Sequence, residues 1–326
     1  MQQSKRNKSI YGWFVLKMIL AAAAFWFIYQ RITGKDELYL EELKSAVSTP
    51  SLGWQLAVIF LLMFLNWLVE AWKWKFMMAK IEELSIFRSL EAVFSGLSIS
   101  IFTPNRIGEY AGRVFHLEKA DKIQATIITV IENSSQLLVT FVIGCVAMMI
   151  FFAEYTPMTK PFLALVILGF TVCSIIVILA YFNVRFLENV FRRLRFPEKW
   201  NQTLHVISSY SSGELLKVVI GAFVRYVIFT TQFVWLIRIF GGHFPLSSTI
   251  LMSAGTFFVI AVVPTFTLTE LGIRGAVAAY FFGYLTTDLL PVLIAVFSLW
   301  VINLAIPALL GALFMLNFRF VKNKAE

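Results

Sequence analysis

The sequence has 326 residues, of which 59% are hydrophobic and only 14% are charged. Soluble domains contain about a quarter charged residues, so this composition excludes an ordinary soluble protein. The formal net charge is +9, but Lys and Arg in a membrane protein mainly set its orientation, and we expect no nucleic-acid partner. The composition predicts an all-α polytopic membrane protein with one integral-membrane domain over residues 1–326.

The first apolar run covers residues 11–29 and follows three basic residues. A cleaved signal peptide is shorter and ends at a small-residue site, so we expect an uncleaved first span. Further runs reach the roughly 20 residues that cross a bilayer core of about 30 Å. They predict five more spans, at about 52–71, 123–152, 162–182, 215–240 and 290–318.

Two apolar runs, 90–103 and 249–263, are too short to cross, because each covers only about 20 Å as a helix. Each stops at a proline, Pro104 or Pro264, and is followed by a charged, glycine-containing segment. Short, interrupted apolar segments at matching places in two halves indicate re-entrant hairpins and a binding site. With the six spans, the hairpins make eight helical membrane segments; they are expected over about 90–118 and 249–285.

The two halves of the chain follow the same pattern. Pro104 and Pro264 lie 160 residues apart, and this shift also places the first two spans on the fourth and fifth. We therefore predict two repeats, about 1–156 and 157–326, each with two spans, a hairpin and a third span. Because three crossings is an odd number, the second repeat is inverted relative to the first.

The distribution of basic residues gives an independent orientation. With the N-terminus inside, the expected cytoplasmic segments contain 17 Lys and Arg residues, four of them in 73–88, and the outer segments contain five. This bias predicts that both termini are cytoplasmic. The basic segment 184–196 places its apolar residues on one helical face, which fits either an interfacial helix on anionic lipid or a solvated loop helix.

The first hairpin contains the strongest candidate site. Pro104 ends the descending half-helix, and Asn105 is suited to cap the ascending one. Free N–H groups from Arg106 to Gly108 would then face the membrane interior, where they and the arginine could bind an anion such as a lipid phosphate.

A structural alternative for the same charges stays open. Glu109 and Arg113 are spaced i,i+4, and Arg106 and Glu109 are spaced i,i+3, so both pairs could lie on one helix face. The charges would then form an ion network that holds the hairpin closed. Both interpretations are compatible if one arginine keeps donors for a phosphate.

Further polar residues lie in the second hairpin and in the long spans. Glu270, Gly272 and Arg274 repeat the arrangement of the first hairpin with Pro264 as the helix break. A charged residue deep in a membrane is a functional candidate, because its insertion costs about 2.5–3.5 kcal/mol. The long spans contain three supporting intramembrane polar residues, Glu132, Asn133 and Arg225. We expect Glu132 and Arg225 to pair across the two repeats.

Other features suggest little chemistry. Asn303 with Pro307 on the last span predicts a kink rather than a site. The sequence contains no P-loop and no metal-spaced His/Cys cluster, so we expect no cofactor, no metal and no assigned catalytic residue. Cys145 and Cys173 both fall in predicted spans and are expected to act as small hydrophobic residues.

The hairpin segments resemble a known family, the integral-membrane domain of lysylphosphatidylglycerol synthases (multiple peptide resistance factor proteins) and its stand-alone relatives. The segment PNRIGEYAGR is similar to the first signature of that family. The resemblance carries over to Pro104, Arg106, Gly108, Glu109 and Arg113.

The second signature is less well matched. PTFTLTELGIRG keeps Pro264 and Gly272, but Thr269 and Glu270 replace paired glycines and Gly275 stands where the family has glutamate. The resemblance implies a lipid-handling domain that moves an aminoacylated lipid between leaflets. These 326 residues contain no soluble aminoacyl-transferase domain, so we do not expect the chain to synthesise that lipid by itself.

These observations predict a multi-pass protein of the bacterial inner membrane that translocates or binds an anionic phospholipid or a polyprenyl-phosphate-type lipid. One alternative is a membrane-embedded transferase that acts on a lipid headgroup, with Glu109 or Glu132 as base. Another is an accessory subunit of a separate glycosyl- or aminoacyl-transferase.

Overall fold

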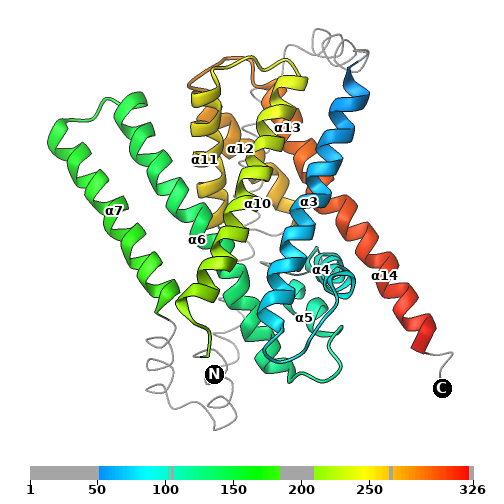
Figure 1. The fold of residues 1–326 in the computed structure, drawn as a ribbon. Coiled ribbons are helices and arrows are strands. Elements are labelled where there is room, and N and C mark those ends of the chain that lie inside the picture. Colours follow the sequence, from blue (N-terminus) through cyan, green and yellow to red (C-terminus); the bar gives the residue numbers. More distant parts are fainter. Residues whose placement is uncertain (1–50, 102, 104–105, 184–208, 264–266, 323–326) are drawn as a thin grey trace, which may run out of the picture.

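The computed structural model describes residues 51–101, 103, 106–183, 209–263 and 267–322. Every regular element in this part of the chain is a helix (Figure 1). Several sequence predictions lie outside the described residues, namely the first span (11–29), the basic helix (184–196), Pro104, Asn105 and Pro264.

Five helical segments are long and apolar enough to cross a membrane. They lie at the five runs predicted as spans after residue 51, and they confirm an all-α, multi-pass membrane protein. The segments are α3 (Leu52–Met78), α6 (Lys122–Tyr155), α7 (Lys160–Phe182), α10 (Ser212–Ile239) and the last span, Leu290–Met315.

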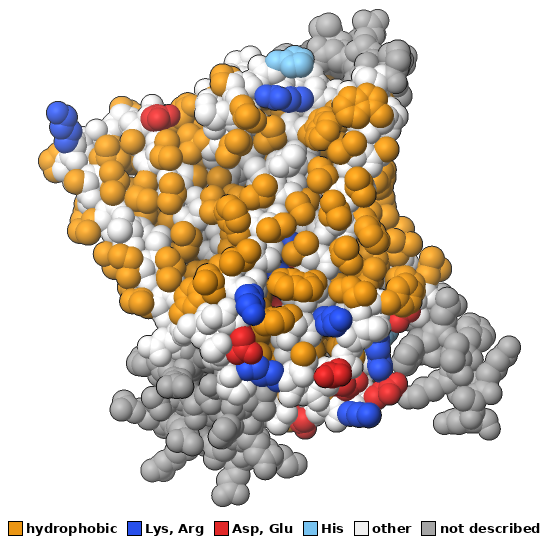
Figure 2. All heavy atoms as spheres, viewed as in Figure 1, with side chains coloured by type: hydrophobic (Ala, Val, Ile, Leu, Met, Phe, Trp, Pro, Cys, Tyr) orange, Lys and Arg blue, Asp and Glu red, His pale blue; other side chains and the backbone are white. Residues whose placement is uncertain are grey.

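The outer surface is apolar, as a bilayer requires. Helix α7 has no buried residue and packs beside α6 at one edge of the bundle (Figure 1). Figure 2 shows hydrophobic side chains across the middle of the visible face and most charged side chains near its lower edge. The charged residues discussed below are therefore exceptional, because they lie inside the bundle.

Two pairs of shorter helices lie at the predicted hairpins. The first pair is α4 (Ile86–Ser100) with α5 (Gly108–Val114), and the second is α11 (Leu246–Val262) with α12 (Thr267–Phe282). Helix α5 packs very closely on α4, since a Cβ atom on Gly112 would lie 2.5 Å from the Cα of Gly96. The two glycines therefore set the distance between these helices.

A buried carboxylate anchors the chain that follows α5. Glu82, in the connection between α3 and α4, accepts N–H bonds from Lys119 and Ala120 at 2.9 Å and from Glu118 at 3.2 Å. Burial acts to raise the pKa of Glu82, but these backbone donors outweigh it and hold the pKa below its usual value.

The last span is interrupted where Asn303 and Pro307 predicted a kink. Helix α13 (Leu290–Trp300) continues into a π-helical segment (Val301–Ala305) and then α14 (Ile306–Lys322). Pro307 cannot donate an N–H and its ring crowds the preceding turn, which explains the local widening. The interruption also turns Asn303 toward Asn66 of α3, whose amide nitrogen lies 3.4 Å from the Asn303 carbonyl oxygen.

Replacing Gly112 by alanine should destabilise the protein by about 1–3 kcal/mol, because the new methyl group meets backbone atoms of α4. Thermal unfolding followed by size-exclusion chromatography in detergent measures this. The control is Gly169→Ala on α7, where a Cβ meets nothing within 4 Å. Equal midpoints for the two variants would contradict the close packing of α4 and α5.

Glu82→Gln should lower the unfolding midpoint at neutral pH, with a loss of about 1–3 kcal/mol. Because the folded-state pKa is depressed, the stabilisation is present above the unfolded-state pKa and is lost as the pH falls through the folded value. The difference from the unaltered protein should therefore shrink as the pH falls below the usual glutamate pKa of about 4.3. The control is Glu83→Gln, an exposed neighbour; a pH-independent difference would exclude this role for Glu82.

Candidate functional site

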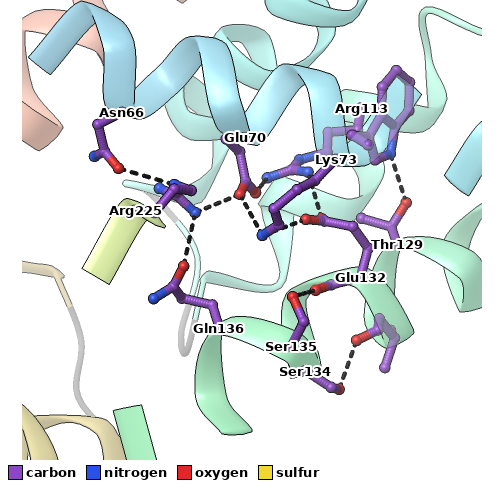
Figure 3. Close-up of polar contacts among 12 residues, drawn as sticks. Asn66, Glu70, Lys73, Arg113, Thr129, Glu132, Ser134, Ser135, Gln136 and Arg225 are labelled. Carbon is purple, nitrogen blue, oxygen red and sulfur yellow. Dashed lines mark hydrogen bonds and ion pairs between the residues drawn. The ribbon is translucent and has the colours of Figure 1, made fainter. Parts of the chain in front are cut away.

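Charged side chains from four helices meet inside the bundle. We call this group the central ion cluster; Figure 3 shows its members on α3, α6 and α10 together with Arg113 of α5. It contains three carboxylates and three cations that pair with one another. Its members are Glu70, Lys73, Glu109, Arg113, Glu132 and Arg225.

Arg113 lies at the centre of this cluster and has no exposed surface. Its guanidinium contacts Glu70 at 2.6 Å, Glu132 at 3.1 Å and also Glu109, so the predicted i,i+4 pair with Glu109 forms. An arginine fork suits several carboxylates at once. Arg113 therefore joins the short helix α5 to α3 and α6, and in this conformation it cannot contact a ligand.

Lys73 corrects the assignment made from the sequence. The sequence predicts it in a cytoplasmic loop, but α3 extends to Met78 and the Lys73 side chain is completely buried. Its ammonium lies 3.0 Å from Glu70 and 2.7 Å from Glu132. The expected cytoplasmic count falls from 17 to 16, which leaves the charge bias unchanged in direction.

Arg225 of α10 does not pair with Glu132, so that prediction is wrong. Its guanidinium contacts Glu70, and it donates to the side-chain oxygens of Asn66 at 3.0 Å and of Gln136 of α6 at 3.5 Å. It also lies over the Trp67 ring, 5.2 Å from the centroid. Arg225 pairs with Glu70 instead. Glu132 pairs with Lys73 and Arg113.

A second charged group connects the two pairs of short helices. We call Arg106, Glu270 and Arg274 the tip triad. Arg106 donates to both oxygens of Glu270, at 2.8 and 3.1 Å, and Arg274 donates through Nε to the same carboxylate at 2.8 Å. The Glu270 carboxylate therefore binds two arginines: Arg106, which is 164 residues away in the sequence, and Arg274, which lies one turn further along α12.

The backbone at Arg106 explains why it reaches Glu270 instead of Glu109. Arg106 precedes α5, which begins at Gly108, and has a φ of +56°, a left-handed conformation that is uncommon for a residue other than glycine. The predicted i,i+3 pair of Arg106 with Glu109 requires helical geometry and does not form. Strained backbone of this kind concentrates at functional sites.

The expected anion site on the backbone is also corrected. The N–H of Gly108 already donates to the Thr103 hydroxyl at 2.8 Å, and the N–H of Arg106 donates to the Thr103 carbonyl at 3.3 Å. A Cβ atom on Gly108 would lie 2.7 Å from the side chain of Ile99. Gly108 therefore serves close packing on α4, and anion binding in this region depends on side chains.

A cavity of about 650 Å³ lies between the tip triad and the central ion cluster. We call it the central cavity. Its wall combines aromatic side chains, among them Trp67 and Trp300, with polar groups. Residues predicted from the sequence that line it are Arg106, Glu109, Asn133, Arg225, Glu270 and Arg274. Gly272 of α12 is buried and does not line the cavity. Arg113 and Glu132 are also buried and lie behind the lining residues of the cavity.

The charges around the cavity do not cancel. The central ion cluster is balanced, whereas the tip triad has two cations and one anion, so the nine residues together carry a formal charge of +1. The excess lies at the tip triad, where Arg106 is 35% and Arg274 is 19% exposed. The cavity can therefore accept one negative charge close to accessible guanidinium groups.

Arg113→Met should cost about 3–5 kcal/mol, because it leaves buried carboxylates without their shared cation. Adding Glu132→Gln removes one of those charges and should recover part of the loss. Thermal unfolding of both single variants and the double variant measures the coupling, with exposed Lys122→Met as control. Strictly additive effects would show that Arg113 and Glu132 do not interact in the folded protein.

The comparison with known proteins agrees with this picture. Residues 14–311 match the family described as the lysylphosphatidylglycerol synthase TM region. No match was found among curated proteins or solved structures. The match covers most of the chain, including both pairs of short helices and the central cavity. The chain therefore belongs to the family of lysylphosphatidylglycerol synthase transmembrane regions, and its function is membrane- and lipid-related.

Proposed function

We propose that the protein is a lipid translocase, or a lipid-binding transporter, that holds an anionic headgroup in the central cavity. The observation that carries the proposal is the tip triad, where two partly exposed arginines share the single carboxylate of Glu270. Guanidinium groups bind phosphate through paired N–H donors. Arg106 and Arg274 are therefore the residues expected to bind the headgroup.

The architecture supports this reading if the short helices are re-entrant hairpins. Helices α4 and α11 have 15 and 17 residues, and their lengths of roughly 23 and 26 Å fall short of a bilayer core of about 30 Å. The contact of Arg106 with Glu270 joins the tips of the two pairs. We infer inverted repeats, about 1–156 and 157–326, whose hairpins enter from opposite sides, with both termini cytoplasmic.

The two charged groups then have different roles. The central ion cluster keeps α3, α5, α6 and α10 together and positions the cavity wall. The tip triad is the exchangeable part: a phosphate that binds Arg106 and Arg274 replaces Glu270 as their counter-ion. Replacement weakens the link between the two hairpins, and this couples headgroup binding to their separation.

The net charge of +1 fits a headgroup with one negative charge, such as the phosphodiester of an anionic phospholipid, and a polyprenyl-phosphate-type lipid offers the same phosphate chemistry. A membrane with such lipids, the bacterial inner membrane, is the proposed location. A separate glycosyl- or aminoacyl-transferase is a proposed partner that would supply or use the lipid. Glu132 is unsuited to act as a transferase base, because it is fully buried and paired with Lys73 and Arg113.

The proposal predicts that Arg106→Ala with Arg274→Ala slows leaflet exchange of a fluorescent phosphatidylglycerol in proteoliposomes by roughly tenfold or more. The reason is that each arginine supplies charge-assisted hydrogen bonds to the phosphate. Lys217→Ala, an exposed basic residue on α10 outside the cavity, is the matched control. All variants are first compared for elution volume and unfolding midpoint in detergent.

Unchanged exchange in the folded double variant would refute the tip triad as the headgroup site. No exchange by the unaltered protein, with full binding of the lipid, would restrict the proposal to a lipid-binding protein. Formation of a new lipid product, detected by mass spectrometry, would favour the transferase alternative.

A further inference from the structure

A second cavity follows helix α10, and no residue of the tip triad lines it. We call it the α10 groove; its volume is about 970 Å³, and residues from α3, α6 and α11 complete its wall. Its lining is mainly apolar, and several of these side chains are about half exposed. The residues used below are Phe223, Val227, Val234, Leu246 and Ile250.

The groove is long enough for an acyl chain. Its lining residues on α10 run from Phe223 to Ile239, which corresponds to roughly 24 Å along the helix axis. One leaflet contributes about half of a bilayer core of about 30 Å. At the Phe223 end, Tyr226 lines both this groove and the central cavity, so the two spaces adjoin there.

Helix α10 carries two arginines in this region, Arg225 and Arg238, of which only Arg238 lines the groove. Arg225, beside Tyr226, is occupied by Glu70 and Asn66. Arg238 lines the opposite end, is exposed, and its guanidinium has no ion-pair or hydrogen-bond partner among the described residues. Among the described residues, Arg238 is therefore the charged group of this groove whose donors are available to an anion.

We propose that the α10 groove is a separate phospholipid site, with the lipid phosphate on Arg238 and the acyl chains along α10 toward Tyr226. A phospholipid matches both features of the groove, because it carries one anionic group at the end of long apolar chains. The site is distinct from the headgroup position at the tip triad. It places a bound lipid next to the central cavity, and it stands whether or not the protein exchanges lipids between leaflets.

The groove contains its own reporter. Trp235 lines it, and the Trp235 ring lies 5.9 Å from that of Trp54. Bromine atoms on acyl chains quench tryptophan fluorescence at short range. In nanodiscs, the full chain and a Trp235→Phe variant are compared with brominated phosphatidylglycerol and brominated phosphatidylcholine, and the difference between the two proteins isolates the Trp235 signal.

We expect phosphatidylglycerol to quench the Trp235 signal at about fivefold lower mole fraction than phosphatidylcholine, as one basic residue near an anionic lipid predicts. Arg238→Gln should remove this preference. Lys160→Gln, a basic residue on α7 outside the groove, should keep it. Replacing Val227 by phenylalanine narrows the groove without adding a tryptophan and should reduce quenching by both lipids.

Three outcomes would overturn the proposal. Equal quenching by both lipids in the unaltered protein would indicate non-selective lipid contact. Absence of quenching would show that protein, such as another segment or a second copy of the chain, covers the groove. A preference that survives Arg238→Gln would place the phosphate elsewhere. None of these results depends on leaflet exchange, so failure here leaves the tip-triad test unaffected.

Discussion

The structure depends on neutralising charge inside a membrane protein. A charged residue near a bilayer centre costs about 2.5–3.5 kcal/mol on insertion scales. Nine charged side chains surround the central cavity or lie behind it, inside the helix bundle. Arg113 contributes most to this neutralisation, because it contacts three carboxylates from three helices. The position of α5 follows from these contacts, and Gly96 and Gly112 allow the close approach that they require.

The balance of charge separates a structural group from a binding group. In the central ion cluster every carboxylate contacts at least one cation. Three of its side chains, those of Lys73, Arg113 and Glu132, are fully buried. The tip triad has two cations and one carboxylate, so its formal charge is +1, and its arginines are partly exposed. A buried, balanced network stabilises one arrangement of the helices, whereas an accessible excess of positive charge attracts an anion. We therefore propose the junction of the two helix pairs as the place of anion recognition.

Hydropathy was enough to predict the long helices, since a run of 20 apolar residues has few alternatives to a span. It also located the short helices, and the residues of the tip triad were all candidates. Their pairing was not predictable: Arg106 and Glu270 are 164 residues apart, and only packing brings them together. Hydropathy predicts a loop position for Lys73, because a lysine near the end of an apolar run lowers the local hydropathy. The side chain is buried instead, since Glu70 and Glu132 neutralise its charge. The Thr103 hydroxyl that occupies the Gly108 amide is likewise a local hydrogen bond that spacing does not reveal.

Native mass spectrometry of the protein extracted with its membrane lipids tests the central claim most directly. We expect the unaltered protein to retain an anionic lipid that is lost when Arg106 and Arg274 are both replaced by glutamine, while a lipid held at Arg238 stays bound. Glu270→Gln, which frees both arginines from their shared carboxylate, should increase retention. Identical lipid content in all three proteins would contradict a headgroup site at the tip triad.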